Sequence, residues 1–482
     1  MRARVVARSR LARSTAAGLL LAAAGACSLA PRYQRPSSPA PAPTYQELEG
    51  WKLAAPADRQ PRGRWWIIYQ DPALDALEGQ LTDANQDLKG ALARLEQARA
   101  ETRIARAAYF PALTAEASAT RTRTSVNSPV YFAGEPTTLN DFIVGGQLSY
   151  EIDLFGRVRN SVAAARASEQ ASTGDVAALE LSLRAELASD YFMLRGLDAQ
   201  QELLDHTVTD YAKALKLTDN LYHGGAAALS DVQQARAQLE TARTQAEDTR
   251  LRRAQTEHAI AVLVGRSATG FRIAAEPLDA AVTPPAIDPG LPSQLLERRP
   301  DVAAAERRVA SANAAIGIAR AAYFPQFSLT GTLGLESLAT ASWIEAPSRF
   351  WSLGPQGALT LFDAGLHRAQ NAAARAAYDG QVASYRAAVL TAYQDAEDNL
   401  AALRQLERES VTEAAAVEAT KGAFEQAVLR YKGGLVTYLE VVSTENAALA
   451  ARLSAVDIQT RRITASILLV KALGGDWHPT AR

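Results

Sequence analysis

Apart from one cysteine, the sequence offers few residues whose types and spacing could do chemistry. The five histidines are scattered with no two at metal-ligand spacing, and no Ser, His and acid cluster stands out. There is no phosphate-binding loop of the GxxxxGK type, and a single Cys excludes both a disulfide framework and a Cys-based metal site. These patterns predict a protein that is not an enzyme and holds no metal and no cofactor. The histidines are His206, His223, His258, His367 and His478.

The single cysteine lies at the end of a predicted signal peptide, residues 1–26. Five arginines fall within the first 13 residues, and an apolar stretch of small residues follows them. The sequence around Cys27 reads AGACS and resembles a lipobox, in which the Cys is acylated and becomes the mature N-terminus. An incidental buried Cys is the competing interpretation, but the position of Cys27 and its uniqueness favour acylation. Ser28, rather than Asp, follows it, and by resemblance to lipoprotein sorting this implies the outer membrane.

Composition points to long helices packed through small side chains. The chain of 482 residues contains 100 Ala, the best helix former, and only 7% aromatic residues. A formal net charge of −1 gives no global electrostatic reason to bind nucleic acid. After Cys27 no run of 18 apolar residues occurs, so no transmembrane helix is expected. Residues 27–64 are Pro-rich and predict an extended tether without a core, and residues 475–482 are expected to form a C-terminal tail.

The chain is a tandem repeat of one large unit. IARAAYFP occurs at Ile104–Pro111 and again at Ile318–Pro325, and Tyr222–Gly225 (YHGG) is matched by Tyr431–Gly434 (YKGG). A repeat this long indicates duplication rather than a solenoid. The predicted parts are a first repeat at 65–265, a Pro-rich equatorial linker at 266–292 and a second repeat at 293–474.

Each repeat has the same predicted order of strand, strand, long helix and shorter returning helix. In the second long helix the apolar residues Tyr378, Val382, Tyr385, Val389 and Tyr393 recur in steps of three and four, which is a coiled-coil pattern. A helix as long as the ranges 157–223 and 366–432 spans about 100 Å. The other predicted helices are about half as long, so two of them end to end would match one long helix. The sequence therefore predicts a tall, thin helical body with breaks at mid-height. Glycine pairs are expected to end the long helices. The predicted strands are 111–124, 141–155, 325–336 and 350–362, and the predicted helices are 157–223, 229–265, 366–432 and 437–474, with others at roughly 79–108 and 293–322.

The four predicted strands alternate an apolar face with a polar face. Such strands of about 10 residues are typical of a membrane β-sheet around a wet lumen, although a soluble sheet resting on helices would show a similar pattern. Four strands have open edges and cannot span lipid alone, whereas three chains would give 12 strands and a closed pore. Pro355 cannot donate to a strand ladder, so a bulge or a strand end is expected there.

Together these features resemble the TolC-type outer-membrane efflux family, and most closely its OprM-like lipoprotein branch. The resemblance covers nearly the whole mature chain. It implies a mostly α-helical fold with a membrane β part: a homotrimer with a 12-stranded barrel, four strands per chain, continuous with a coiled-coil tunnel across the periplasm. It also implies a periplasmic adaptor and an inner-membrane RND-type pump as partners. The motifs that carry it are Cys27–Pro36 (CSLAPRYQRP), Tyr150–Arg157 (YEIDLFGR), Leu295–Asp301 (LLERRPD) and Leu361–Gly365 (LFDAG).

The resemblance further implies a gate where the long helices reverse, at the tip turns Gly224-Gly225 and Gly433-Gly434. The family closes this tip with a Tyr and an Arg from the second repeat, bonded to an acid and a hydroxyl from the first. Tyr431, Asp231 and Ser230 occupy three of those places, and Val436 occupies the place of the Arg. Of two acidic rings at the narrowest point, Glu440 matches the first and Ser443 the second. Asp231 and Glu440 could instead be solvated residues at helix starts, where the helix dipole favours acids.

The expected function is therefore that of a passive outer-membrane exit duct for drugs or other toxic small molecules, anchored by lipid and extending into the periplasm of a Gram-negative bacterium. Two alternatives remain open. One is a channel for type I protein secretion, which the acylated N-terminus and Pro-rich tether disfavour. The other is a structural coiled-coil lipoprotein without a pore, which would need no alternating strands.

Overall fold

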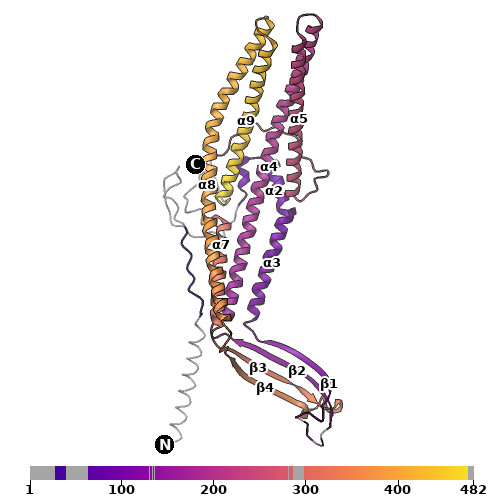
Figure 1. Ribbon diagram of the computed structural model, residues 1–482, viewed down its shortest axis with the longest axis vertical. Coiled ribbons are helices and arrows are strands. Elements are labelled where there is room, and N and C mark those ends of the chain that lie inside the picture. Colours follow the sequence, from indigo (N-terminus) through magenta and orange to yellow (C-terminus); the bar gives the residue numbers. More distant parts are fainter. Residues whose placement is uncertain are drawn as a thin grey trace. The chain divides into compact units, whose positions relative to one another are not determined.

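The computed structural model describes residues 28–38, 63–129, 131–132, 134, 136–279, 282–285 and 298–475. The predicted signal peptide, Cys27 and most of the predicted tail therefore lie outside the described residues. The described helices and strands are, in chain order, η1 (Trp65–Tyr69), α2 (Pro72–Ala84), α3 (Gln86–Ala107), β1 (Ala112–Arg123), β2 (Thr138–Ile152), α4 (Arg157–His223), α5 (Leu229–Leu263), α7 (Pro300–Ala321), β3 (Gln326–Ser337), η2 (Thr340–Ser342), η3 (Ala346–Ser348), β4 (Arg349–Ala358), α8 (Leu366–Lys432) and α9 (Tyr438–Ala472) (Figure 1).

The chain divides into two compact units, and each takes segments from both sequence repeats. The sheet unit holds the described parts of Met1–Ser37, Leu95–Ser172 and Ala305–Tyr385. The hairpin unit holds the described parts of Ser38–Arg94, Thr173–Ala304 and Arg386–Arg482. The two repeats are therefore interleaved in space and do not fold as two separate bodies.

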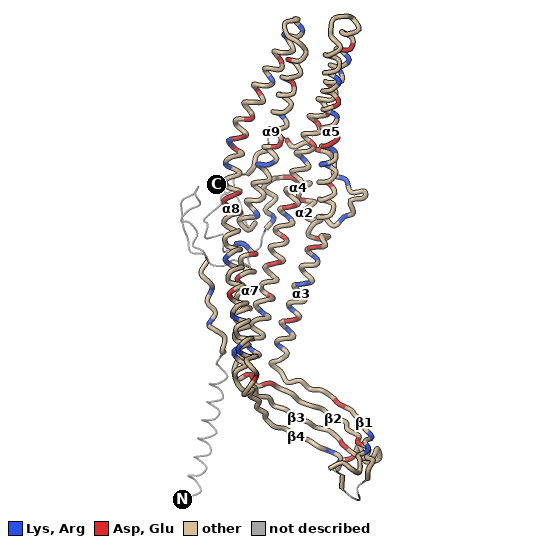
Figure 2. The backbone as a smooth tube through the Cα atoms, in the orientation of Figure 1, with Lys and Arg blue, Asp and Glu red and all other residues tan. Residues whose placement is uncertain are grey.

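The sheet unit contains one antiparallel sheet in the order β1-β2-β3-β4, with a hairpin from each repeat. The register places Leu113, Leu148 and Leu353 in one row across the sheet, and Leu333 opposite Trp351 in the next row on the same face. The other face carries a row of polar side chains, and charged residues are sparse along the strands (Figure 2). The polar row is Thr114, Gln147, Thr332 and Ser352. One face of the sheet is thus apolar and the other polar.

The expectation of a bulge or strand end at Pro355 is wrong. Pro355 lies inside β4, opposite Leu329 in a continuous register. β4 is an edge strand of the sheet, and an edge strand tolerates proline because one of its sides carries no ladder hydrogen bonds.

Two of the strands end earlier than predicted, and an aspartate caps the helix that follows each of them. The predicted second strand ran to residue 155, but β2 stops at Ile152 because the Asp153 carboxylate accepts a hydrogen bond of 2.9 Å from the Arg159 backbone N–H. The predicted fourth strand ran to residue 362, but β4 ends at Ala358. Asp363 then accepts hydrogen bonds from the backbone N–H groups of Gly365 and His367, both at 2.9 Å.

The start of the predicted tether is packed against helices of the sheet unit. Asn313 on α7 donates to the Pro31 carbonyl at 2.9 Å, and Tyr33 donates to the Glu306 carboxylate at 3.3 Å. Arg35 lies 3.5 Å from the same carboxylate and donates to the Tyr385 hydroxyl on α8. Residues 28–36 are therefore not a free tether, because polar side chains on α7 and α8 hold them. We call this segment the strap.

α4 and α8 cover the two ranges predicted as long helices, and their C-terminal parts belong to the hairpin unit, where α5 and α9 return beside them. Large apolar side chains from α4, α5 and α9 form a core, among them Leu187, Leu194, Ile260 and Ile467, which are fully buried. The helix predicted over roughly 79–108 is divided into α2 and α3. Asn85 lies between them, where its side chain bonds the Leu88 N–H and the Leu263 carbonyl at the end of α5.

Candidate functional site

The two helix reversals in the hairpin unit have the same backbone structure. At the first, the Ala226 N–H donates to the Leu221 carbonyl at 2.7 Å and the Gly225 N–H donates to the Tyr222 carbonyl at 2.9 Å. The second turn repeats this pattern with Leu435 and Gly434 as donors. Such a helix end requires one left-handed residue, and Gly225 and Gly434 supply it with φ of 73° and 69°. The glycine pairs thus end the helices as predicted from the sequence.

Helices α4, α5, α8 and α9 pack together just below these turns. Tyr438, Val441 and Val442 of α9 are buried against Ala235 of α5 and Ala427 of α8. Tyr431 packs on this cluster, with its ring centroid 5.6 Å from that of Tyr438. Burial, and then the negative charge of Asp231, raise the pKa of the Tyr431 hydroxyl above its ordinary value. Residues from both repeats therefore meet at this site.

Asp231 acts on Tyr431 through its charge, while its side chain caps a helix. The carboxylate accepts a hydrogen bond of 3.3 Å from the Ala228 N–H at the start of α5. Among the described contacts, the Tyr431 hydroxyl has no hydrogen bond to Asp231. Ser230 and Ser443 are both exposed, and Ser443 lies about one turn after Glu440 on α9. Asp231 thus serves as a helix-start residue in this chain.

Glu440 has a partner that the sequence did not reveal. The Arg430 guanidinium on α8 donates to the Glu440 carboxylate at 2.8 Å, across the Gly433-Gly434 turn. Both side chains are partly exposed, at 54% for Arg430 and 40% for Glu440. A hairpin turn brings residues ten positions apart face to face, and that spacing across a glycine pair was the available signal. The second repeat thus supplies an arginine at the tip after all, from α8 rather than from the place held by Val436.

The described residues contain no group of three or more His, Cys, Asp and Glu side chains placed to hold a metal ion. Among the same residues, no helix is both long and apolar enough to cross a bilayer. The chemistry available at the turns consists of carboxylates, one guanidinium, a phenol and hydroxyls. Such groups can attract or repel ions and can form hydrogen bonds with each other.

Comparisons with known proteins agree with one another. The family model described as outer membrane efflux protein matches residues 77–266 and 291–475. Outer membrane protein OprJ of Pseudomonas aeruginosa is 34% identical over 94% of this chain and 94% of its own length. The solvent efflux pump outer membrane protein SrpC of Pseudomonas putida is 33% identical, over 94% of this chain and 96% of its own.

The fold agrees as well. The Campylobacter jejuni CmeC outer membrane channel matches with a TM-score of 0.87 at 25% identity, covering 95% of this chain and 96% of that one. The open-state Neisseria gonorrhoeae MtrE outer membrane channel matches with a TM-score of 0.79 at 28% identity, covering 93% and 98%. The family model matches well over half of the chain, and the relatives and solved structures named here cover at least 93% of it. The chain therefore belongs to the outer membrane efflux protein family.

Proposed function

We propose that this outer membrane efflux protein is the passive exit duct of a tripartite pump, through which drugs or other toxic small molecules leave the cell. The main support for this proposal is the sheet, which has one apolar face and one polar face. On its apolar face Leu113 and Trp351 are 78% and 75% exposed, while the opposite face is a band of hydroxyl and amide groups. An apolar outer face and a wet inner face are what a membrane β-sheet around a lumen requires.

The duct is a homotrimer in this proposal. The sheet has free edges at β1 and β4, and unpaired backbone groups at an edge cost several kcal/mol each in hydrocarbon. Three copies joined edge to edge would form a closed barrel of twelve strands. The helices continue from that barrel as the tunnel through the periplasm.

A lipid anchor at Cys27 belongs to the same proposal. Cys27 lies outside the described residues, but the adjacent Ser28 donates to Asn160 on α4 at 3.0 Å. Asn160 is eight residues beyond the end of β2. Acyl chains on Cys27 would therefore enter the membrane next to the helix-side end of the sheet, where the barrel meets the periplasm.

The partners proposed are a periplasmic adaptor and an inner-membrane RND-type pump, which supplies the energy. Relatives are named for the efflux of solvents, toluene and antibiotics, so the cargo proposed here is small and largely apolar. The gate is proposed at the turns, with Glu440, Ser443, Asp231, Ser230 and Tyr431 lining it.

Single-channel recording of the purified protein tests this function. The proposal expects discrete conductance steps in a planar bilayer, and increased drug susceptibility when the gene is deleted. A structural lipoprotein without a pore would give no steps. Steps together with unchanged susceptibility and the loss of a secreted protein would instead identify a protein-secretion channel.

A further inference from the structure

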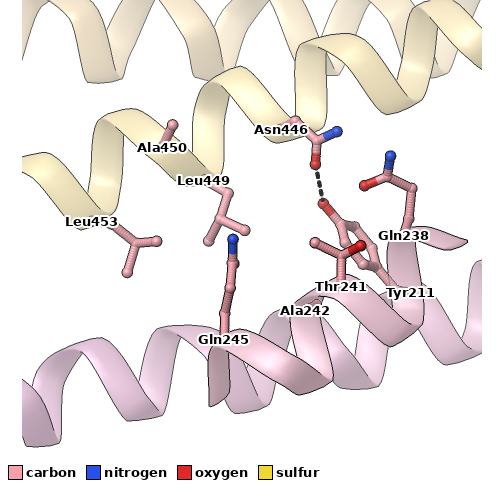
Figure 3. A pocket seen from close by; sticks show the side chains of 9 residues that line it. All are labelled: Tyr211, Gln238, Thr241, Ala242, Gln245, Asn446, Leu449, Ala450 and Leu453. Atoms are coloured by element: carbon pink, nitrogen blue, oxygen red, sulfur yellow. Dashed lines mark hydrogen bonds between the residues drawn. The ribbon is translucent and has the colours of Figure 1, made fainter. Parts of the chain in front are cut away.

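The two helical hairpins of the hairpin unit meet along a polar and loosely packed contact below the turns. The Tyr211 hydroxyl of α4 donates to the Asn446 side chain of α9 at 3.0 Å, and Tyr211 itself is only 4% exposed. Beside this bond is a cavity of about 300 Å³ between α5 and α9. Figure 3 shows the residues that face each other across it, namely Gln238, Thr241 and Gln245 from α5 and Asn446, Leu449 and Leu453 from α9. We call this contact the hairpin seam.

The seam continues along the same two helices. A second cavity of about 670 Å³ shares Gln245 and Leu453 with the first. Amide and hydroxyl groups around open space hold two helices together less firmly than an interdigitated apolar core. This stretch therefore resists separation of the two hairpins less than the apolar cluster of Tyr438, Val441 and Val442 next to it.

Two carboxylates oppose each other at the hairpin seam. Glu445 precedes Asn446 on α9, and Asp210 precedes Tyr211 on α4, so the acids adjoin the Tyr211–Asn446 hydrogen bond. A second hydrogen bond joins the same two helices nearer the turns, between Thr218 and Tyr438. Glu445 is half-buried. Burial, and then the charge of Asp210, raise the pKa of Glu445 to about 7 from 4.5.

The other groups around Glu445 do not neutralise it. The charge of Glu445 acts on Tyr211 and Tyr438, and both hydroxyls have pKa values raised above the ordinary range, chiefly by burial, so they stay uncharged at neutral pH. Lys213 pairs with Asp210 at 3.0 Å on the exposed side of α4. The α5 side chains that line the neighbouring cavity, Gln238, Thr241 and Gln245, are uncharged. Phe424, Ala427 and Val428 of α8 pack on the apolar cluster nearer the turns.

We propose that Glu445 and Asp210 form a proton-sensitive clasp at the hairpin seam, which acid closes and alkali loosens, so that pH biases the opening of the duct. The proposal rests on the proposed function of the turns as a gate. When Glu445 is protonated, the repulsion from Asp210 is removed and the Tyr211–Asn446 bond holds the hairpins together. When Glu445 is charged, separating the hairpins returns it to water and increases its distance from Asp210.

The direction of the pH effect follows from the linkage between proton binding and closure of the seam. The closed seam raises the pKa of Glu445 to about 7, so the closed form binds an extra proton relative to an open form in which the acid is hydrated. The preference for the closed form is greatest below pH 4.5, falls as pH rises to about 7, and is constant above that. Between the two pKa values, each increase of one pH unit lowers the ratio of the closed form to the open form by about tenfold.

The test is the open probability of the purified trimer in planar bilayers at pH 5 and pH 8. We expect the ratio of open to closed channels to rise about 70-fold per chain in the wild type and to stay near its pH 5 value at both pH values in Glu445→Gln. Glu240→Gln is the matched control, because Glu240 is an exposed acid on α5 that pairs with Arg243 of its own helix. A Glu445→Gln variant with the wild-type pH response would overturn the clasp, as would loss of that response in Glu240→Gln.

Hydrogen exchange separates failure of the clasp from failure of the proposed function, because it needs no conductance. At pH 8 the backbone amides of 206–232 and 433–450 should exchange several-fold more slowly in Glu445→Gln than in the wild type, and at pH 5 the two proteins should exchange alike. Equal exchange at pH 8 would contradict the clasp even if the protein conducts. The expected difference in a protein without conductance would support the clasp and contradict the channel.

Discussion

Arg430→Gln should make the duct more selective for cations. In the structure the Arg430 guanidinium lies 2.8 Å from the Glu440 carboxylate, so each chain offers the passage a paired charge rather than a free carboxylate. Removing the arginine exposes three carboxylates in a trimer, and a ring of carboxylates favours cations. Glu440→Gln leaves three free guanidinium groups and should shift selectivity toward anions. The double variant should return close to the wild type, because it removes both charges.

The coupling energy between Arg430 and Glu440 depends on how exposed the two side chains are. Side chains that are 54% and 40% exposed place the pair among surface salt bridges, for which measured coupling energies are about 0.2–1 kcal/mol. The turn should therefore be only slightly destabilised by either single variant, by less than about fivefold in its folding equilibrium. Selectivity should change without loss of assembly, which separates an electrostatic effect from a structural one.

The assay is the reversal potential of single channels in asymmetric salt, measured for the wild type, both single variants and the double variant. The single variants should shift it in opposite directions, and the shifts should shrink as the salt approaches 1 M, where the screening length is about 3 Å. An unchanged reversal potential in Glu440→Gln would remove Glu440 from the constriction. Shifts of the same sign in both single variants would refute the pairing argument.

Three further predictions follow from other parts of the chain. Cys27→Ser should abolish incorporation of a radiolabelled fatty acid, and a wild-type protein without label would exclude acylation. Glu78, which is 0% exposed with neither carboxylate oxygen hydrogen-bonded, has a pKa that burial raises to about 8 from 4.5. The free energy of unfolding should therefore fall as pH rises from about 4.5 to 8, and Glu78→Gln should reduce the difference in melting temperature between pH 5 and pH 8. Gly434→Ala should destabilise the chain by about 1 kcal/mol because its φ is 69°, whereas Gly422→Ala, inside α8, should stabilise it by about 0.5–1 kcal/mol; urea unfolding of both variants checks the opposite signs.

Periodicity and helix-ending residues predicted much of the architecture. The glycine pairs define where α4 and α8 end, because a left-handed residue after a helix is a local property of the chain. The alternation of apolar and polar residues along each strand predicted the two faces of the sheet, because that alternation is also a local property of the chain. The strand ends were harder to predict. Asp153 ends β2 by capping the next helix, and the sequence alone does not show which backbone groups an aspartate near a strand end will bond.

Contacts between residues far apart in the sequence could not be predicted from the sequence. Tyr33 and Glu306 are 273 positions apart, and nothing in a Pro-rich segment indicates that α7 holds a buried carboxylate for it. The pairing of Arg430 with Glu440 depends on how the turn folds back, and the resemblance directed attention to Val436 instead. The opposition of Glu445 to Asp210 depends on the relative rotation of two helices from different repeats. Sequence periodicity defines the faces of helices but leaves open which faces meet.

The most direct test of a trimeric duct is the mass of the protein after gentle extraction from the outer membrane, measured by native mass spectrometry. The edges of a four-stranded sheet are satisfied in lipid only when copies join, so the account predicts a single species containing three chains. A monodisperse monomer under the same conditions would contradict the account, because one chain would then have to keep β1 and β4 unpaired in the membrane.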